Sequence, residues 1–442
     1  MQHQRASRVW PLLAALVATV AALAVSACGG NDDESGGSGA KTTTITFLVG
    51  QQESTRLEAA ARDLVDSYNE SQSKIEVKRE SLPPDQIRTV IKTRLNSNNG
   101  PDVFSYDTGP GFGGVLAKAG LVQPLDSAYD KYGWKIYDWA RSRATYGGKT
   151  YGIPEQVEEV GVFYNKDLFD KLGVQPPKTL DELEQIADKA KQQGITPLAF
   201  ANKEQWPAGH QFSMMVSNII GRQGLDQILY GNGSWDSPDV VKGIDLYFRQ
   251  FEDNGYFPRG VNGLDYDSGN ALFYSQKAAM LPTGTWLISD LAQKAPFEVG
   301  FFPFPSIDGS SVAPPAGVGS GLFVNAQSKN KQAAYEFMNW LVSDETAKRQ
   351  IETFNAIPAF PVDTDELDVS PLFRQVITDL KDSEDASAFG YNVDVLTPAN
   401  FNEVMFTGFQ EVLNGQRSPQ EQAQQLEAAW AKAKKSGDIL ER

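Results

Sequence analysis

The feature that most limits how this chain can fold is a repeated alternation of apolar strands and amphipathic helices. Residues 44–49 form an apolar, partly β-branched run, and residues 55–69 follow with apolar side chains at helical spacing. The order continues with a strand at 75–78, a helix marked by apolar residues over 87–95, and a strand at 102–106. A β-α-β-α-β order predicts a mainly parallel sheet flanked by helices, which is the α/β class.

Polar residues follow the first and third predicted strands, where a parallel sheet would bind a ligand. Gln51 and Glu53 lie in the loop after the first strand, and Asp107 ends the third strand. Ligands of open α/β sheets bind beyond the carboxyl ends of the strands. We therefore expect Gln51, Glu53 and Asp107 to line a binding site.

The length of the chain requires more than one compact unit. Its 442 residues exceed what a single hydrophobic core usually organises. The strand and helix pattern starts again after residue 166, with a capping box at 179–182 and a strand at 195–200. Two lobes, each with its own mainly parallel sheet, are therefore expected.

Residues 151–166 lie between the two arrays and contain an apolar strand with two adjacent carboxylates, Glu158 and Glu159. Adjacent residues of a strand point to opposite faces, so these side chains cannot act as one pair on a regular strand. A carboxylate that is buried without partners is costly, so at least one of them should face a cleft or a ligand. We interpret the stretch as a hinge crossing between the lobes; strand geometry separates the two acids, and the family resemblance described below selects Glu158 and leaves Glu159 as ordinary structure.

The N-terminal segment has the pattern of a secretory signal. Arg5 and Arg8 precede an apolar run at about 11–25, which is too short to span a membrane but fits the core of a signal peptide. Small residues follow this run and lead directly into Cys28, the single cysteine of the chain. The pattern resembles a bacterial lipobox, which implies removal of residues 1–27 and lipidation of Cys28.

Lipidation would anchor Cys28 in the lipid bilayer at the outer face of the cell membrane, with a flexible Gly- and Ser-rich tether reaching to residue 41. It would also leave the mature chain without a free thiol. Disulfides, thiolate zinc sites and cysteine nucleophiles are therefore excluded.

Composition and motifs argue against several other kinds of chemistry. A net charge of −16 argues against nucleic-acid binding, which needs a basic surface. Gly147-Gly148-Lys149-Thr150 lacks the glycine that a phosphate-binding loop carries five positions before its second glycine, so it is interpreted as a hairpin turn. His210 is the only histidine left after signal removal, and we interpret it as structural. No metal site and no cofactor are expected.

Aromatic residues near strand ends favour a carbohydrate ligand. Trp206, Trp235 and Trp286 lie in predicted loops or turns among polar residues, and Asp265 lies in a loop at 260–268. Indole rings cover the apolar C–H faces of a sugar, while carboxylates and amides bind its hydroxyl groups. We expect Trp206, Asp265 and Trp286 to contact the ligand.

Two other functions remain open from the residues alone. A glycoside hydrolase needs one protonated carboxylic acid and a second carboxylate near it. The candidate pairs are Asp265/Asp267 and Glu158/Glu159, of which strand geometry argues against the second. A binder of a non-sugar solute is the other alternative. For a phosphorylated solute we would expect arginines and lysines clustered at strand ends, and the sequence shows no clear cluster of this kind.

Short motifs in order along the chain resemble those of the extracytoplasmic sugar-binding proteins of ABC importers, the family 1 bacterial extracellular solute-binding proteins that include maltose-binding protein. The resemblance covers nearly the whole mature chain. Its motifs are Pro154 with Val157-Glu158 and Tyr164-Asn165-Lys166, then Asp265-Tyr266 with Gly284-x-Trp286, then Gly317-x-Gly319 with Asn325, and finally Ala356-Ile357-Pro358.

The resemblance implies a two-lobe periplasmic-binding-protein-like fold of type II with three crossings between the lobes. It implies that Glu158 contacts the sugar, and that Gly317 and Gly319 let the backbone approach the ligand closely. It further implies a non-enzymatic monomer that closes around a di- or oligosaccharide and delivers it to membrane-embedded ABC permease subunits. The expected ligand-binding residues are Gln51, Glu53, Asp107, Glu158, Trp206, Asp265, Trp286, Gly317 and Gly319.

The expected domain boundaries follow from these crossings. They are residues 1–27 for the signal peptide, 28–41 for the lipidated tether, 42–152 with 284–330 for the first lobe, and 153–283 with 331–442 for the second lobe.

Overall fold

A computed structural model describes the chain from Thr42 onward. The described residues are 42–437 and 439, except 53, 98, 308–311, 364–366 and 386–388; the side chains of 381–385 are also not described. Cys28 and the predicted signal peptide and tether lie outside the described residues, and so does Glu53. Among the described residues, none of the helices combines the length and the apolar character needed to cross a bilayer.

The first sheet has five strands in the order β2-β1-β3-β12-β6. Strand β1 pairs in parallel with both β2 and β3, while β12 pairs antiparallel with β3 and with β6. The parallel arrangement expected for the first three strands is therefore confirmed. The strands are β1 (Thr43–Gly50), β2 (Ile75–Leu82), β3 (Val103–Asp107), β6 (Gly152–Pro154) and β12 (Ser320–Val324).

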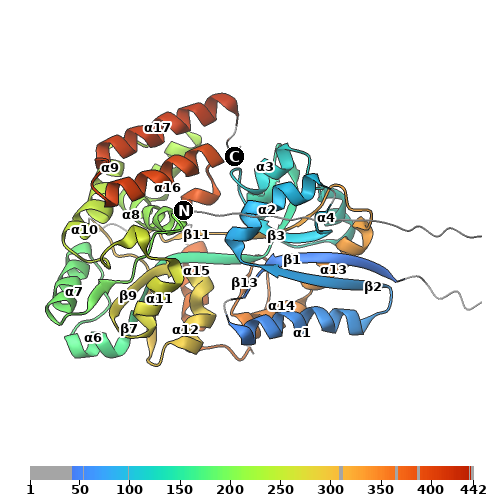
Figure 1. Ribbon diagram of the computed structural model, residues 1–442, viewed down its shortest axis with the longest axis horizontal. Coiled ribbons are helices and arrows are strands. Elements are labelled where there is room, and N and C mark those ends of the chain that lie inside the picture. The colour runs from blue at the N-terminus through green and yellow to red at the C-terminus, as the bar shows by residue number, and fades with distance from the viewer. Residues whose placement is uncertain are drawn as a thin grey trace, which may run out of the picture. The chain divides into compact units, whose positions relative to one another are not determined.

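Helices cover both faces of this sheet because the buried residues of β1 alternate between them. Phe47 packs on one face against Phe337 of α13, with ring centroids 5.0 Å apart, whereas Leu48 packs on the other face with Ile87 and Ile91 of α2. Figure 1 shows α1 and α2 on opposite sides of β1 and β2. The helices on this side are α1 (Thr55–Ser71), α2 (Pro84–Asn96), α3 (Gly113–Lys118), α4 (Asp126–Tyr132), α5 (Asp138–Arg141), α13 (Lys331–Leu341) and α14 (Asp344–Phe354).

The second sheet is organised around one long strand, β7. Its path is β14-β11-β7-β9-β8, and β10 and β13 also pair with β7. The pairings of β7 with β9, β10, β11 and β13 are all antiparallel. This sheet is therefore mixed, in contrast to the mainly parallel sheet expected. The strands are β7 (Gln156–Asn165), β8 (Thr196–Leu198), β9 (Ala278–Gly284), β10 (Val299–Phe302), β11 (Pro315–Gly317), β13 (Ile357–Pro358) and β14 (Gly390–Tyr391).

Helices also surround the second sheet. Helix α8 bends at Gly221, which has a φ of 63°, and α16 packs against both α8 and α17. Trp235 lies in a turn, as expected, but it is fully buried between Phe212, Phe401 and Trp430 and is therefore part of the core. The helices on this side are α6 (Lys166–Leu172), α7 (Leu180–Gln192), α8 (Trp206–Tyr230), α9 (Pro238–Ile244), α10 (Phe251–Asp253), α11 (Tyr266–Tyr274), α12 (Ile288–Lys294), α15 (Pro371–Asp385), α16 (Ala399–Leu413) and α17 (Pro419–Ser436).

The chain passes between the sheets at positions that differ from the predicted boundaries. It leaves the first sheet after β6 through Glu155 and returns between β11 and β12 at Val318 and Gly319. Residues 299–317, which were assigned to the first lobe, contain β10 and β11 of the second sheet. Residues 331–354, which were assigned to the second lobe, form α13 and α14 against α1 and β1. These assignments depend on strand partners more than 100 residues away, which local patterns do not reveal.

Glu159 lies on the face of β7 opposite to Glu158 and is 1% exposed. Neither of its carboxylate oxygens has a hydrogen-bond partner among the described residues. Burial, with a smaller contribution from the charge of Asp379, raises the pKa of Glu159 to about 8. This carboxyl group therefore favours its neutral form in the folded protein and its charged form in the unfolded chain.

Replacement of Glu159 by glutamine should make stability less dependent on pH. Because the pKa of Glu159 is raised from 4.5 in the unfolded chain to about 8 in the folded protein, folding stability falls as the pH rises between these values. The contribution reaches at most about 1.4 kcal/mol per pH unit. Urea unfolding of Glu159→Gln from pH 5 to 9 should show a shallower decline than the parent protein.

The exposed Glu70 provides the control for this prediction, since Glu70→Gln removes the same charge at the surface of α1. If Glu159→Gln and Glu70→Gln both retain the decline of the parent protein, Glu159 is not neutral when buried.

Candidate functional site

A cavity of about 740 Å³ lies between residues of the two sheets and their helices. Most of the predicted ligand residues line it, although they come from distant parts of the chain. Gly317 does not line the cavity, and Glu53 is outside the described residues. The predicted residues in its wall are Gln51, Asp107, Glu158, Trp206, Asp265, Trp286 and Gly319.

Glu158 reaches the cavity from β7, beside the point where the chain crosses between the sheets. Gln156 Nε2 donates a hydrogen bond of 2.8 Å to its Oε1. Burial raises the pKa of Glu158 to about 7, although the hydrogen bond from Gln156 and the nearby His210 oppose this shift. Near neutral pH the group therefore exchanges readily between an acceptor-only carboxylate and a carboxylic acid that can also donate.

Gly319 makes room for this carboxyl group. A Cβ atom at position 319 would lie 2.3 Å from Oε2 of Glu158, a separation that real side chains do not tolerate. The glycine was expected to let the backbone approach the ligand, but the structure shows its space taken up by Glu158. Gly317 pairs with Glu158 within β11 and β7 and has no comparable close contact.

Four aromatic side chains form one wall of the cavity. Trp206 and His210 lie one turn apart at the start of α8, and their rings approach those of Tyr266 and Trp286. The ring of Trp206 is centred 5.0 Å from His210, 4.7 Å from Tyr266 and 6.2 Å from Trp286. His210 and Trp286 are 5.1 Å apart. Their exposed faces give the cavity an apolar surface on which a flat ring can stack.

The orientation of Trp286 is set by two neighbours. Its Nε1 donates a 3.0 Å hydrogen bond to the hydroxyl oxygen of Tyr266, which is itself 2.7 Å from the hydroxyl of Thr283. The indole also lies directly over Gly284, where a Cβ atom would come within 1.7 Å of the ring. Gly284 therefore permits the Trp286 conformation that the cavity uses.

Asp107 is held by an arginine that sequence reasoning missed. Arg88 of α2 donates from Nε and from its terminal nitrogen to the two oxygens of Asp107, at 2.8 and 2.6 Å. It also donates to Asp85 at 2.8 Å. This two-point geometry fixes the carboxylate plane of Asp107 toward the cavity. The i, i+3 spacing of Asp85 and Arg88 was the only sequence signal, and it indicates no more than a helix surface pair.

Other polar groups of the wall have structural partners as well. Asp265 caps α11 by accepting a 2.8 Å hydrogen bond from the backbone of Ser268, so the predicted ligand residue also has a helix-capping role. His210 Nε2 lies 3.4 Å from Oδ2 of the buried Asp394. Glu204 accepts a 3.0 Å hydrogen bond from the backbone of Tyr266. His210 therefore pairs with Asp394 and also belongs to the cavity wall.

The cavity wall is acidic as a whole. The lining carboxyl groups outnumber the basic groups, which disfavours an anionic ligand because its charge would meet several carboxylates at short range. Among the described residues, no group of three or more metal-binding side chains is placed to hold an ion. The acidic residues are Asp85, Asp107, Glu158, Glu204, Asp265, Asp267 and Asp394, and the basic residues are Arg88 and Lys294, with His210 as the histidine.

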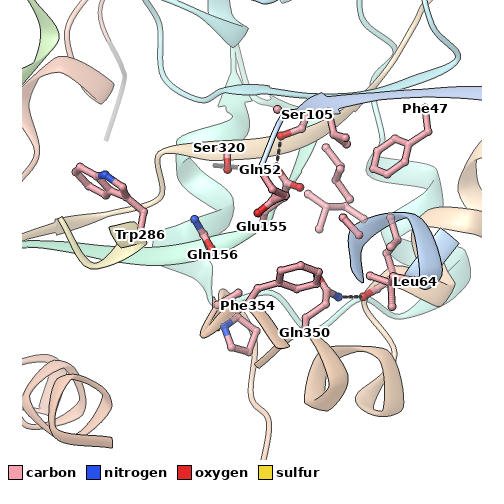
Figure 2. A pocket seen from close by; sticks show the side chains of 18 of the residues that line it. Phe47, Gln52, Leu64, Ser105, Glu155, Gln156, Trp286, Ser320, Gln350 and Phe354 are labelled. Atoms are coloured by element: carbon pink, nitrogen blue, oxygen red, sulfur yellow. Dashed lines mark hydrogen bonds between the residues drawn. The ribbon is translucent and has the colours of Figure 1, made fainter. Parts of the chain in front are cut away.

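A second cavity of about 410 Å³ adjoins the first. Figure 2 shows Trp286 at one end of this cavity and Phe47 and Leu64 at the other, with Glu155 and Gln156 between them. Ser105 donates a short hydrogen bond to Glu155, and burial raises the pKa of this carboxyl group. The two cavities share part of their lining, namely Gln51, Gln52, Pro84, Asp107, Trp286 and Ser320.

Comparison with known proteins supports a solute-binding role. A family model described as bacterial extracellular solute-binding protein matches residues 51–348. A multiple sugar-binding protein from Streptococcus mutans is 26% identical over 329 residues, which cover 72% of this chain and 74% of that protein. A maltotriose-binding protein from Pyrococcus abyssi is 25% identical over 334 residues, which cover 75% of this chain and 67% of that protein.

A solved structure of similar fold is that of a chitin oligosaccharide binding protein. It superposes with a TM-score of 0.78 over 89% of this chain and 100% of that chain, at 24% sequence identity. At this identity the likeness establishes the fold. It confirms the predicted two-lobe α/β architecture of the periplasmic-binding-protein type.

Proposed function

This chain belongs to the bacterial extracellular solute-binding proteins, and we propose that it binds a carbohydrate outside the cytoplasm and delivers it to an ABC permease. The two curated relatives described above are named for binding multiple sugars and maltotriose. The proposed ligand is a di- or oligosaccharide, because the cavity of about 740 Å³ exceeds the space that one sugar ring fills.

The observation that supports a sugar most directly is the pairing of indole faces with carboxylates in one cavity. Trp206 and Trp286 present apolar faces, while Glu158 and Asp107 present oxygens that accept hydrogen bonds from hydroxyl groups. Charge-assisted hydrogen bonds of this kind contribute roughly 1.5–3 kcal/mol each. A pyranose offers the complementary surface, with C–H groups on its faces and hydroxyl groups at its edge.

We propose no catalytic activity for this cavity. Glu158 faces the cavity, whereas Glu159 is buried on the other face of β7, so the two adjacent acids do not form a hydrolytic pair. Asp265 and Asp267 stand at the start of α11, where Asp265 is engaged in capping. The relatives matched by this chain are described as binding proteins.

Closure of the two lobes around the ligand is part of the proposal. The loop after β3 touches the segment after β14 so closely that only glycine fits. A Cβ atom at Gly109 would lie 2.0 Å from the carbonyl oxygen of Val395, and one at Gly111 would lie 2.8 Å from that of Thr397. Lobes that separate would break this contact, so it favours the closed arrangement and with it ligand retention.

The proposal retains the lipid anchor predicted at Cys28 and a monomeric protein. Both rest on the sequence, since Cys28 lies outside the described residues. An anchored binding protein stays close to its permease, so the ligand-loaded protein has a shorter distance to diffuse before it delivers the ligand.

Thermal denaturation with a panel of mono-, di- and oligosaccharides tests the function. A sugar present at 100 times its Kd should add about 2.7 kcal/mol to the free energy of unfolding. Glu158→Gln and Trp286→Ala should each weaken binding of the responding sugar by about tenfold or more, because each removes a ligand contact. Isothermal titration calorimetry gives the Kd values. A panel without any response, or full affinity in both variants, would refute the proposal.

Gly111→Ala should weaken sugar binding without lowering the stability of the ligand-free protein. The added methyl group would lie 2.8 Å from the carbonyl oxygen of Thr397 and 3.1 Å from the backbone nitrogen of Ala399, and separation of the lobes would relieve both contacts. We expect an affinity loss of about tenfold, the effect of 1.4 kcal/mol against closure. Gly263→Ala is the matched control, since nothing lies within 4 Å of its Cβ position. Equal Kd values for the two variants would argue against the closing contact.

Cys28→Ala should release the protein from membranes, because acyl chains attached to Cys28 provide the proposed anchor. Fractionation of cells expressing either form, followed by immunoblotting, measures the distribution. Retention of Cys28→Ala in the membrane fraction would count against lipid anchoring and leave the sugar-binding proposal untouched.

A further inference from the structure

Arg143 is a buried arginine that reaches from the first lobe to the second. It lies in a short 3-10 helix, η1 (Ser142–Ala144), which packs against α5 and β6, and it is 8% exposed. The carbon of its guanidinium lies 5.4 Å from the ring centroid of Tyr391, which belongs to β14 of the second sheet. The guanidinium also forms a hydrogen bond with the side chain of Tyr230, at the end of α8.

This contact continues the close glycine contact between the lobes. The backbone nitrogen of Gly109 donates a 3.1 Å hydrogen bond to the carbonyl oxygen of Arg143, and Gly109 itself lies against Val395. Val395 follows Tyr391 by four residues in the chain. Separation of the lobes that breaks the contact of Gly109 with Val395 would therefore also withdraw Arg143 from Tyr391. We call these four residues the interlobe seam.

Arg143 brings its charge into the interlobe seam without an acidic partner. Within the described part of the chain it forms no ion pair, and its Nε has no hydrogen-bond partner. A second guanidinium, that of Arg222 in α8, lies 5.3 Å from the same ring centroid of Tyr391. Two positive charges thus approach one aromatic ring. Asp226 accepts a 2.7 Å hydrogen bond from the hydroxyl group of Tyr391 and does not pair with Arg143.

The surroundings of Arg143 are unfavourable for its charge. Burial lowers the pKa of Arg143, and Arg222 adds to this effect, while Tyr230 and Tyr391 offset only part of it. An arginine side chain stays protonated in proteins, so the guanidinium is buried in its charged form. The contact with Tyr391 recovers some of the lost hydration through the cation–π interaction, but the unpaired Nε recovers none.

We propose that Arg143 opposes closure of the lobes, so that the ligand-free protein favours the open form and closes when a bound sugar supplies the missing free energy. The inference rests on the closure that is part of the proposed function. Opening returns the guanidinium to water, where its charge is fully hydrated. The close fit at Gly109 and Gly111 favours the closed form and the buried charge opposes it, so their balance sets the fraction of closed molecules.

The effect of Arg143 on affinity does not require contact with the ligand. Arg143, Tyr230 and Tyr391 line neither of the two cavities. The apparent Kd of a ligand rises when only a fraction of the protein is in the binding-competent form. A change at position 143 should therefore alter the Kd of every sugar that binds by the same factor, whereas loss of a direct contact would affect different sugars unequally.

Single-molecule FRET without sugar measures the open and closed forms directly. Dyes attached through Lys92→Cys in α2 and Glu403→Cys in α16 report the separation of the lobes, since both positions are exposed and belong to opposite lobes. The full chain with Cys28→Ala serves as the parent, so that only the added thiols react. Arg143→Met keeps the length of the side chain and removes its charge, and it should raise the ratio of closed to open molecules about tenfold.

Titration calorimetry with the responding sugars gives the second measurement. Arg143→Met should lower all their Kd values by a common factor of up to about tenfold, because more molecules are already closed. Arg141→Met is the matched control. Arg141 pairs with Asp126 at 3.8 Å and lies 4.2 Å from the ring centroid of Tyr129, both in its own lobe, so this variant should change neither the FRET ratio nor the Kd values.

Tyr230→Phe tests the inference in the opposite direction. It removes the hydroxyl group that hydrogen-bonds to Arg143, so the buried guanidinium loses a partner and the ratio of closed to open molecules should fall. Added to Arg143→Met, the same change should have no effect on the ratio, because the guanidinium is absent. Thermal denaturation checks that each variant is folded.

The outcomes separate the inference from the function on which it rests. A ratio that falls or stays the same in folded Arg143→Met overturns the inference, and so does an equal rise in Arg141→Met. If Arg143→Met does not fold, Tyr230→Phe decides, and a ratio that does not fall overturns the inference. If no sugar of the panel binds, the proposed function fails, while the FRET ratios still decide the role of Arg143.

Discussion

Backbone pairing along β7 is the constraint on which the rest of the structure depends. This strand pairs with β9, β10, β11 and β13 and continues directly from β6 of the first sheet. Its hydrogen bonds determine which distant segments meet beside the crossing. Its alternation sends Glu158 into the cavity and Glu159 into the core, so one strand both joins the lobes and places a ligand-facing carboxyl group between them.

Glycines next to the cavity leave room for neighbouring side chains and backbone. Gly319 leaves room for the carboxyl group of Glu158, Gly284 leaves room for the indole of Trp286, and Gly109 and Gly111 allow the two sides to touch. At each of these positions the missing Cβ accommodates another part of the protein. The resulting cavity has carboxylates at its edge and indoles on its wall, and it adjoins a second cavity.

Several of the predicted residues that line the cavity had a local physical signal in the sequence. Glu158 and Glu159 stood out together as carboxylates in an apolar strand, and the family resemblance selected Glu158. Trp206 and Trp286 stood out as indoles among polar residues near strand ends. Trp235 carried the same signal and is buried in the core instead, because neighbouring helices cover it. Arg88 had no distinguishing signal, since its role depends on Asp107, which meets it only after β3 and α2 pack together.

The sequence by itself determined the α/β class, the two-lobe organisation and the opposite directions of Glu158 and Glu159, because strand alternation and helical spacing are local properties. Only the tertiary structure decided which strands join β7, where the chain returns to the first sheet, and that a second cavity adjoins the first. These features depend on backbone pairs and side-chain contacts between residues far apart in the chain. Contacts of this kind produce no periodic pattern in the sequence, so they cannot be predicted from local residue spacing.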